Sequence, residues 1–490
     1  MRKPQLLTEP REAPGKKTRT SVAAKAAGLT EEMRERISLA EKGRANVGLT
    51  FKKSKSLVER LKGSGATDVA VESFTTVTQM IRFANSEITV SKRFDESSLK
   101  LYVAFGPQRA VLTTTDLSAT GLRRFLQEAI RTAKSTPPSD LYASLPAGPF
   151  GYEKQLLDQR MRGITEERLV GFVEEAVNEA LNAGASRVAG TLVHRRVLRR
   201  LVTSGGVEAE AVKDTIEISV RAFLDGESSG QFAVGTGKLG DFNPGKVGRE
   251  AGEIAKMAKD PGEVAEGKYD AIIGPMTAAN LIEEVGGMAS AFYVDSQFSF
   301  LTGKIGEKVA SDVFTLLDDP TIPGTYGSEP FDEEGVPTRR KPIIESGVLK
   351  GYLHNSATAK KFNTESTGNA GIIVPSPFQL VVEGGSTPFS KLISKVDNGI
   401  FVTNDWYLRY RDVRRGEFST IPRDGLFLIR HGSIERAIKG LRISDNFLRI
   451  LSSIEDMSAE RYPIVWWEVE TPVMAPYLLV REVNFTRPTA

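Results

Sequence analysis

The sequence predicts an α+β protein with an N-terminal domain of two repeated helix–antiparallel-strands–helix units and a mainly-β C-terminal domain. Three observations predict this class. Residues 65–105 align without a gap on residues 184–224, at an offset of 119 positions. The second half carries short strand-like runs separated by tight turns. Strands do not alternate regularly with crossover helices, which argues against a doubly wound parallel sheet.

The internal repeat extends from turn residues to strand positions. Gly65-Ala66-Thr67 matches Gly184-Ala185-Ser186, and Asn85 matches Ser204. Apolar residues then recur at every second position in each copy, which is the spacing of a strand with one buried face. The matched positions are Leu99, Leu101 and Val103 in the first copy and Ile218, Val220 and Ala222 in the second. The sequence therefore predicts a duplicated unit of antiparallel strands.

Helices are expected at both ends of each unit. Thr165 is a good N-cap, with Glu166 and Glu167 in the first helical turn, and Gly184 fits the position just after the helix. Asn243-Pro244 is a second favourable helix start. Apolar residues at helical spacing place the helices near residues 57–61, 122–133, 169–181 and 247–258.

The second half opens with one helical stretch, residues 276–291, and then changes to strand signals. Glu345-Ser346-Gly347 is typical of a tight turn, and a short helix is expected near Asp445. The expected strand segments are residues 343–344, 348–353, 378–383, 399–410, 426–430 and 477–483. The predicted organisation is a basic, disordered leader (1–45), a duplicated N-terminal domain (46–262) and a mainly-β C-terminal domain (268–490).

The composition excludes several classes of function. The chain of 490 residues has no cysteine, which excludes disulfides, thiolate metal ligands and a cysteine nucleophile. The net charge is +3, but the first 50 residues hold 11 Lys/Arg and 6 Asp/Glu. The basic excess thus lies on the leader and not on the folded body, which argues against nucleic-acid binding. Because we find no run of 18 apolar residues and no signal-like segment, we expect no membrane association and a cytoplasmic location.

Two glycine-rich strings match catalytic patterns but lack the required surroundings. Residues 226–230 (GESSG) fit G-x-S-x-G, yet they lie between two strand-like runs, whereas a nucleophile elbow joins a strand to a helix. Residues 235–240 (GTGKLG) fit G-x-G-x-x-G, yet the next helix starts only after Asn243-Pro244. We interpret the first string as a hairpin turn and the second as a glycine-rich connection.

Titratable residues give little sign of a metal site. His194 is expected at an exposed position of a basic strand, His354 after a strand and His431 in a hairpin turn. Their spacing gives no support for convergence on one ion. An acidic stretch could bind Mg²⁺ or Ca²⁺ or act in acid–base chemistry, but solvated turns explain it better. This stretch comprises Asp318, Asp319, Asp332, Glu333 and Glu334.

Several segments together resemble the TldD/PmbA family, whose members are also described as modulators of DNA gyrase or as TldD/TldE proteases. The segments are residues 82–86 (RFANS), 318–320 (DDP), 334–340 (EGVPTRR), 347–354 (GVLKGYLH), 366–370 (STGNA) and 439–446 (KGLRISDN). The resemblance covers about residues 50 to 485. It implies that TldD-type subunits hold zinc through a helical His-Glu-x-x-x-His pattern and a more distant cysteine, with the Glu as general base.

This chain departs from that zinc pattern. Matching Val285-Gly286 to the family places Ile282 and Gly287 at the two histidine positions and Glu283 at the general-base position. A shift by one residue places Glu283 and Met288 there, again without histidine. Since neither Ile nor Gly offers a lone pair on its side chain, no metal ligands are expected in this chain.

The departure makes the chain similar to the TldE/PmbA-type subunit. That resemblance implies a non-catalytic subunit that pairs with a zinc-bearing TldD-type partner in a peptidase acting in proteolysis or peptide processing. It also implies an extended peptide substrate, which a β-rich domain can hold through backbone hydrogen bonds. Gly368, Gly384 and Gly385 are the expected peptide-binding positions, because a residue without a side chain permits close backbone approach.

Two other hypotheses stay open, and with them the question whether the chain is itself an enzyme. The first is a homo-oligomeric peptide-binding or scaffold protein, such as a homodimer with the leader as its adaptor, without protease activity. The second is an independent hydrolase that uses Glu283, Asp318 and Asp332.

Overall fold

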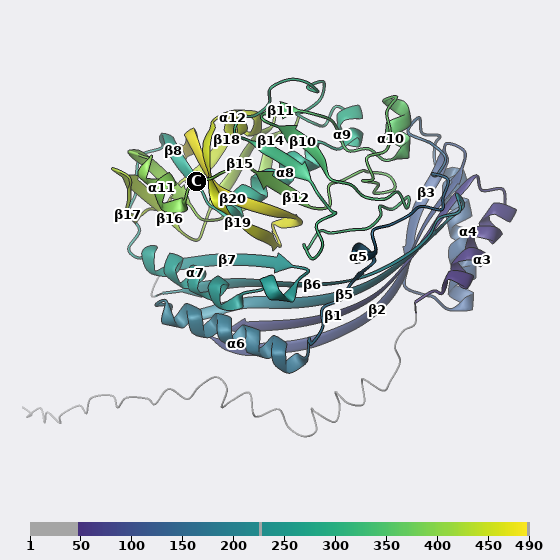
Figure 1. The fold of residues 1–490 in the computed structure, drawn as a ribbon, viewed down its shortest axis with the longest axis horizontal. Coiled ribbons are helices and arrows are strands. Elements are labelled where there is room, and N and C mark those ends of the chain that lie inside the picture. Colours follow the sequence, from purple (N-terminus) through teal and green to yellow (C-terminus); the bar gives the residue numbers. More distant parts are fainter. Residues whose placement is uncertain (1–47, 225–227, 488–490) are drawn as a thin grey trace, which may run out of the picture. The chain divides into compact units, whose positions relative to one another are not determined.

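The computed structural model describes residues 48–224 and 228–487 of the chain. The described residues belong to one compact unit. All of the predicted leader, residues 1–45, lies outside the described residues, and so do residues 225–227, of which 226 and 227 belong to the 226–230 string. The described part is α+β, as predicted, and its strands form two sheets (Figure 1).

The first sheet contains the two predicted repeats side by side. Its strand order is β3-β2-β1-β5-β6-β4, with β7 paired to β6. The strands are β1 (Asp68–Ala84), β2 (Glu87–Phe105), β3 (Gln108–Thr114), β4 (Asp158–Gln159), β5 (Arg187–Thr203), β6 (Glu208–Phe223) and β7 (Ser229–Thr236). β1 and β5 pair antiparallel, and their bounds differ by the same offset as the sequence repeat, which confirms the duplication.

A helix precedes and follows the long strands of each repeat. These are α3 (Phe51–Gly63) and α4 (Ala119–Ser135) in the first repeat, and α6 (Glu166–Asn182) and α7 (Pro244–Met257) in the second. The predicted caps are confirmed: Arg168 N donates to Thr165 Oγ1 at 3.3 Å, and Lys246 N donates to Asn243 Oδ1 at 2.8 Å. α6 and α7 pack on each other and against strands of the second repeat (Figure 1). Short helical turns lie at α5 (Lys154–Leu157) and η1 (Leu239–Asp241).

The second sheet belongs to the C-terminal half and is mostly antiparallel. Its strand order is β11-β10-β9-β12-β20-β8-β13-β16-β17, and β14, β15, β18 and β19 pair outside this path. Among the described residues its parallel strand pairs are β12–β20 and β13–β8, so the structure is not a doubly wound parallel fold. The strands are β8 (Gly267–Ile273), β9 (Thr315–Asp318), β10 (Lys341–Glu345), β11 (Val348–Leu349), β12 (Leu380–Glu383), β13 (Asn398–Val402), β14 (Asp405–Asp412), β15 (Glu417–Pro422), β16 (Leu426–Arg430), β17 (Ser433–Ala437), β18 (Arg442–Asn446), β19 (Ile454–Trp466) and β20 (Val469–Thr486).

The helices of this half are short except the first. They are α8 (Pro275–Met288), α9 (Ala291–Asp295), α10 (Ser356–Lys361), α11 (Phe389–Ser394) and α12 (Phe447–Ser452). The single helix expected over residues 276–291 is therefore two helices. Ser290 has an extended backbone (φ −61°, ψ 122°), and its hydroxyl donates to Pro375 O at 2.6 Å, which separates α9 from α8.

The strand expected over residues 399–410 is also divided. Between β13 and β14, Thr403 and Asn404 leave the sheet ladder and use their side chains as hydrogen-bond donors. Thr403 Oγ1 donates to Gly425 O at 2.9 Å, and Asn404 Nδ2 donates to Gln231 Oε1 at 2.8 Å. The strand expected over residues 348–353 shortens to the two residues of β11.

The main apolar core joins the two halves of the chain. One buried cluster contains Val173 and Val177 of α6, Ile218 of β6, and residues of α8 and β20. A second cluster lies between α3, α4 and the strands of the first repeat. The boundary expected between residues 262 and 268 falls just before β8 and stays a prediction. No helix among the described residues is long and apolar enough to cross a membrane.

Candidate functional site

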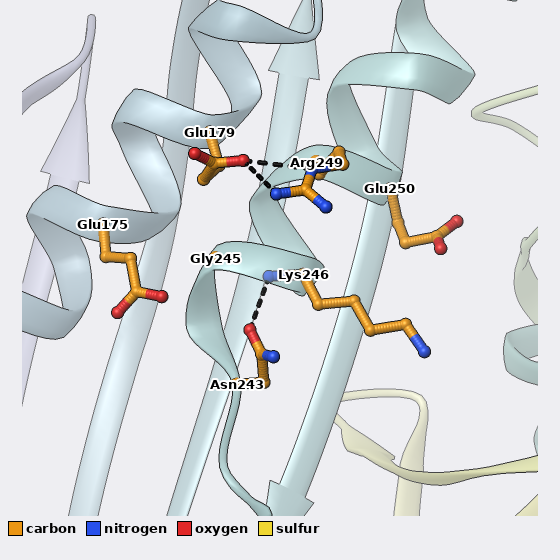
Figure 2. A pocket seen from close by; sticks show the side chains of 7 residues that line it. All are labelled: Glu175, Glu179, Asn243, Gly245, Lys246, Arg249 and Glu250. Carbon is orange, nitrogen blue, oxygen red and sulfur yellow. Dashed lines mark hydrogen bonds and ion pairs between the residues drawn. The ribbon is translucent and has the colours of Figure 1, made fainter.

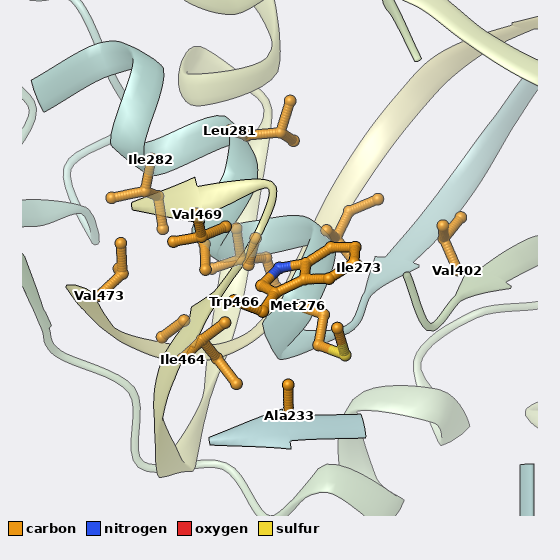
Figure 3. Close-up of a cluster of buried hydrophobic side chains, with 14 of the residues drawn as sticks. Ala233, Ile273, Met276, Leu281, Ile282, Val402, Ile464, Trp466, Val469 and Val473 are labelled. Atoms are coloured by element: carbon orange, nitrogen blue, oxygen red, sulfur yellow. The ribbon is translucent and has the colours of Figure 1, made fainter. Parts of the chain in front are cut away.

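Helix α8 carries the two positions at which the resemblance places the zinc-binding histidines. An apolar core residue, Ile282, occupies the first of them. Pro275 lies in the first turn of α8, where backbone N–H groups have no acceptor within the helix, so the missing N–H of proline costs no hydrogen bond. Ile282 is 1% exposed and lies in the main apolar core. Figure 3 shows it beside Val469 and Val473. This side chain serves core packing and has no lone pair to offer a metal.

The second position, Gly287, has no side chain, and a Cβ placed there would meet nothing within 4 Å. The residues present at the two family ligand positions therefore do not fit a zinc ion. Across residues 48–224 and 228–487, no group of three or more His, Cys, Asp or Glu residues is arranged to hold a metal.

Glu283, where the resemblance places the general base, is bound to strand β20. Thr471 N donates to Glu283 Oε1 at 2.5 Å. Burial, together with the neighbouring Glu284, raises the pKa of Glu283 to about 7 against the lowering effect of that hydrogen bond. Burial likewise raises the pKa of Glu284, which accepts a hydrogen bond from Tyr410 Oη at 2.8 Å. Both carboxyl groups thus have partners within this chain.

A second titratable group near α8 was not predicted. Asp405, at the start of β14, has no exposed surface and accepts hydrogen bonds from Asn280 Nδ2 of α8 at 3.1 Å and from Thr420 Oγ1 at 2.6 Å. Burial raises the pKa of Asp405 to about 7. Its sequence neighbours carry no recognisable pattern, because its partners come from two distant segments.

The acidic stretch is not made of solvated turns, and that interpretation is wrong. Asp318 and Asp332 are fully buried, and Glu334 is 3% exposed. The cause for Asp318 is a set of donors around one carboxylate. Phe378 N and Gln379 N donate to Oδ1 at 2.9 and 3.0 Å, and Lys341 Nζ lies 2.9 Å from Oδ2.

Asp332 organises the loop that follows β9. Its Oδ1 accepts from Glu334 N and Val336 N, both at 2.9 Å, and its Oδ2 accepts from Ala370 N at 3.0 Å. Glu334 accepts from Ser356 N and Oγ at 3.0 and 2.6 Å. Burial raises the pKa of Asp332 to about 6 and that of Glu334 to about 8. The pair therefore holds three loop segments together and offers no free carboxylate.

Two cations of the first sheet connect it to this loop. Arg199 of β5 donates from Nε to Glu72 Oε1 at 2.5 Å and from Nη1 to Phe331 O at 2.8 Å. Lys100 Nζ of β2 lies 2.5 Å from Glu333 Oε2. Arg199 is only 9% exposed, because these acceptors neutralise and surround its guanidinium group.

The three histidines lie in three separate places. His194 is 3% exposed, so the prediction of an exposed position is wrong. Its Nδ1 is 3.2 Å from Gln79 Oε1, and its Nε2 is 3.6 Å from the buried Asp214. His354 is buried beside Phe362, and burial lowers its pKa to about 4. His431 lies in the β16–β17 hairpin turn, as predicted, and is exposed.

The glycines expected to bind a peptide all have left-handed backbones. Gly368, Gly384 and Gly385 have φ of 70°, 96° and 81°. A Cβ at Gly368 would lie 2.6 Å from Pro337 O, and one at Gly385 would overlap Ser458 O. These glycines permit close approach of the chain's own backbone. Their part in peptide binding stays a prediction.

The two glycine-rich strings, residues 226–230 and 235–240, were interpreted as a hairpin turn and as a glycine-rich connection. β6 and β7 pair as a hairpin around residues 226–230, of which 226 and 227 lie outside the described residues. Ser228 Oγ donates to Ala255 O, so this hydroxyl is engaged. Residues 235–240 run from the end of β7 into η1, and α7 begins later, at Pro244.

A polar pocket of about 380 Å³ lies between α6 and α7. Figure 2 shows its charged residues, which include Glu175, Glu179, Lys246 and Arg249. Arg249 Nε donates to Glu179 Oε2 at 3.0 Å, and the Asn243 side chain caps α7 by accepting from Lys246 N. The Arg249–Glu179 pair fastens the two helices, and partial burial raises the pKa of Glu250.

An aromatic patch lies close to α8. It consists of Trp406, Tyr407, Trp466 and Trp467 and contains every tryptophan of the chain. Trp466 is 5% exposed, whereas Trp467 and Tyr407 are 54% and 43% exposed, with ring centroids 6.1 Å apart. Large aromatic groups exposed together are typical of surfaces that bind another molecule. This patch was not predicted from the sequence, although the adjacent Trp466 and Trp467 could have indicated it.

Known proteins match both the sequence and the fold. The PmbA/TldA metallopeptidase central domain matches residues 161–259, and the PmbA/TldA metallopeptidase C-terminal domain matches residues 266–487. The fold and these matches define a metallopeptidase-like protein. The chain belongs to the PmbA/TldD family.

Relatives with curated descriptions match part of the chain. A metalloprotease of Methanothermobacter thermautotrophicus is 30% identical over 221 residues, which are 44% of this chain and 48% of that protein. A metalloprotease TldD homolog of Buchnera aphidicola subsp. Acyrthosiphon pisum is 28% identical over 213 residues, 42% of this chain and 44% of that protein. The chain thus spans about half the length of the curated relatives it matches.

Solved structures share the fold over most of the chain. A candidate modulator of a DNA gyrase from Thermotoga maritima has a TM-score of 0.77 and 24% identity, covering 89% of this chain and 100% of that one. TldE from Thermococcus kodakarensis has a TM-score of 0.77 and 18% identity, covering 88% of this chain and 99% of that one. At these identities the likeness shows the fold alone.

Proposed function

We propose that this protein is a TldE-like, non-catalytic subunit of a metallopeptidase complex, in which a TldD-type partner carries the zinc. In this proposal the complex acts on extended peptides in proteolysis or peptide processing, in the cytoplasm. The observation that carries the proposal is the position of Ile282. Family membership supplies the metallopeptidase context, and a fully packed hydrocarbon stands where that context requires a metal ligand.

The surroundings of α8 support a structural role for its polar residues. Glu283 accepts from Thr471 N, and Glu284 accepts from Tyr410 Oη, so each carboxyl group holds α8 to a different strand. A general base needs access to a water or substrate proton. Glu283 instead uses its Oε1 within the chain, which favours a fastening role over catalysis.

The aromatic patch is the surface that we assign to the partner. Trp467 and Tyr407 expose large rings close to α8, and Trp467 adjoins the β20 segment that binds Glu283. Aromatic side chains dominate the energetic centres of protein interfaces. A partner bound at this patch would lie next to α8, the helix that corresponds to the metal-binding helix of a TldD-type chain.

Co-purification from native cells tests the proposal. The tagged chain should recover a family member that has both histidines and the cysteine, and the pair should cleave unstructured peptides while the isolated chain does not. Trp467→Ser should weaken recovery of the partner at least tenfold, whereas Phe298→Ser, another exposed aromatic residue, should not. Glu283→Gln should leave the peptidase activity of the pair in place.

Two results would contradict the proposal. One is peptide cleavage by the isolated chain that Glu283→Gln abolishes, which would support the independent hydrolase. The other is recovery of the chain only with copies of itself, which would support the homo-oligomeric scaffold.

A further inference from the structure

A pocket of about 310 Å³ lies between the first sheet and the C-terminal half, apart from α8. Its volume falls at the lower end of the range, about 300–1,000 Å³, in which small-molecule sites occur. β1, β5 and β6 form one wall, and residues 326–333 with Phe378 form the other. Six of its fifteen lining residues are apolar: Phe74, Leu156, Val197, Ala211, Pro330 and Phe378.

Most charged groups of the lining already have partners. Arg199 donates to Glu72 and to two backbone carbonyls, as described above. Lys213 Nζ donates to Glu329 and to the carbonyls of Tyr326 and Ser328, so its three N–H groups are used. Glu333 is paired with Lys100 and accepts from Ile372 N. The polar wall is therefore largely neutralised within the chain.

Arg195 is the exception. In the described part of the chain it forms no ion pair, and its one hydrogen bond runs from Nη1 to Tyr326 Oη at a long 3.4 Å. The Tyr326 hydroxyl itself donates to Glu217, which orients its oxygen to accept from Arg195. A guanidinium has five N–H donors in a planar fork, so Arg195 keeps most of its hydrogen-bonding capacity.

Arg195 lies on the face of β5 that lines the pocket, so its free N–H donors are available there. Arg195, Val197 and Arg199 alternate along one face of the strand, and all three line the pocket. Arg196, on the opposite face, pairs with the buried Asp214. A planar guanidinium fork that forms no direct ion pair is suited to bind a planar anion such as a carboxylate.

We propose that this pocket binds a carboxylate that ends a small apolar or aromatic group, with Arg195 holding the carboxylate and the apolar lining holding the group. Two sources have this chemistry: a free apolar carboxylic acid and the C-terminal residue of a peptide. The site is distinct from α8 and does not depend on the chain having a catalytic partner.

Calorimetric titration of the isolated full chain with 3-phenylpropionate tests the site. The expected result is saturable binding with a Kd below about 1 mM, and binding of 3-phenylpropanamide at least tenfold weaker. Arg195→Gln should weaken phenylpropionate binding at least tenfold, and Arg195→Lys should restore part of it. Arg93→Gln, which alters an exposed arginine on β2, should leave binding unchanged. Val197→Phe, which fills the pocket from the same strand, should abolish it.

A second pair of ligands separates the two sources. If N-acetyl-Ala-Ala-Phe with a free carboxylate binds more tightly than phenylpropionate, and its C-terminal amide does not bind, the occupant is a peptide C-terminus. If phenylpropionate binds and the peptide does not, the occupant is a free acid. The proposal is overturned if neither carboxylate binds saturably, or if Arg195→Gln, folded by circular dichroism, binds phenylpropionate as the unaltered chain does.

Discussion

The backbone N–H of Thr471 donates to Glu283 Oε1 over 2.5 Å, so this glutamate of α8 is bound to β20. The same burial that positions this carboxyl group raises its pKa to about 7. Because Glu283 changes charge near neutral pH inside a helix–strand contact, the free energy of unfolding depends on pH.

Glu283→Gln should remove part of this pH dependence. A carboxyl group whose pKa is raised on folding binds its proton more tightly in the folded state, so the free energy of unfolding falls as pH rises from about 4.5 to about 7. Gln cannot ionise but can still accept from Thr471 N. Relative to the unaltered chain, the variant should therefore gain up to about 3 kcal/mol between pH 5 and pH 8 in urea unfolding. An equal difference at both pH values would contradict the raised pKa.

Asp405→Asn should behave in the same direction, since burial also raises the pKa of Asp405 to about 7. The amide can keep one acceptor for Thr420 Oγ1. Thermal unfolding at pH 5 and pH 8 should show the variant improving relative to the unaltered chain at the higher pH. Glu345→Gln, a change at a largely exposed carboxylate, is the control and should show no such trend.

Ile282→Ala and Gly287→Ala should have opposite effects. Ile282→Ala leaves a cavity in the main core and should lower the free energy of unfolding by about 2–5 kcal/mol. At Gly287 the added methyl meets no atom, and alanine favours the helix, so stability should rise by about 0.5–1 kcal/mol. Denaturant unfolding of the two variants checks both values. A tolerated Ile282→Ala would show that this position is not held by packing.

Asp318→Ala should be among the most damaging single changes in the C-terminal half. It removes the acceptor for Phe378 N and Gln379 N and leaves Lys341 without its partner. Loss of one member of a buried ion pair costs about 3–5 kcal/mol. Asp312→Ala, at an exposed ion pair with Lys308, should change stability by less than about 0.5 kcal/mol. Comparable effects in the two variants, measured by urea unfolding, would contradict the buried network.

Gly385→Ala should destabilise the protein through backbone strain. Gly385 has φ of 81°, and a methyl group there would overlap Ser458 O, so both conformation and space oppose alanine. Gly351→Ala, where a Cβ meets no atom within 4 Å, is the matched control. Thermal unfolding should place Gly385→Ala well below Gly351→Ala. Equal melting temperatures would show that this turn relaxes.

Local patterns in the sequence were sufficient for the architecture of the first half. Thr165 and Asn243 cap the helices they were expected to cap, and β1 and β5 keep the repeat offset because each unit is specified by neighbouring residues.

Features that depend on distant partners could not be predicted in this way. Asp318 and Asp332 are acidic residues in turn-like sequence, and solvation was the natural interpretation. Their burial depends on backbone donors at Phe378 and Ala370, about 40 to 60 positions away. His194 was likewise expected at an exposed strand position, and it is buried because strand pairing brings Asp214 beside it. Arg195 likewise could not be identified from sequence as a binding residue, because this depends on Arg199 and Lys213 having acceptors within the chain.

Metal analysis of the purified full chain tests the central claim most directly. After expression in zinc-supplemented medium and gel filtration, plasma mass spectrometry should find far less than one zinc per chain, and a co-purified TldD-type partner should carry the metal. One tightly bound zinc per isolated chain, lost on changing Glu283 or another residue of α8, would contradict the account.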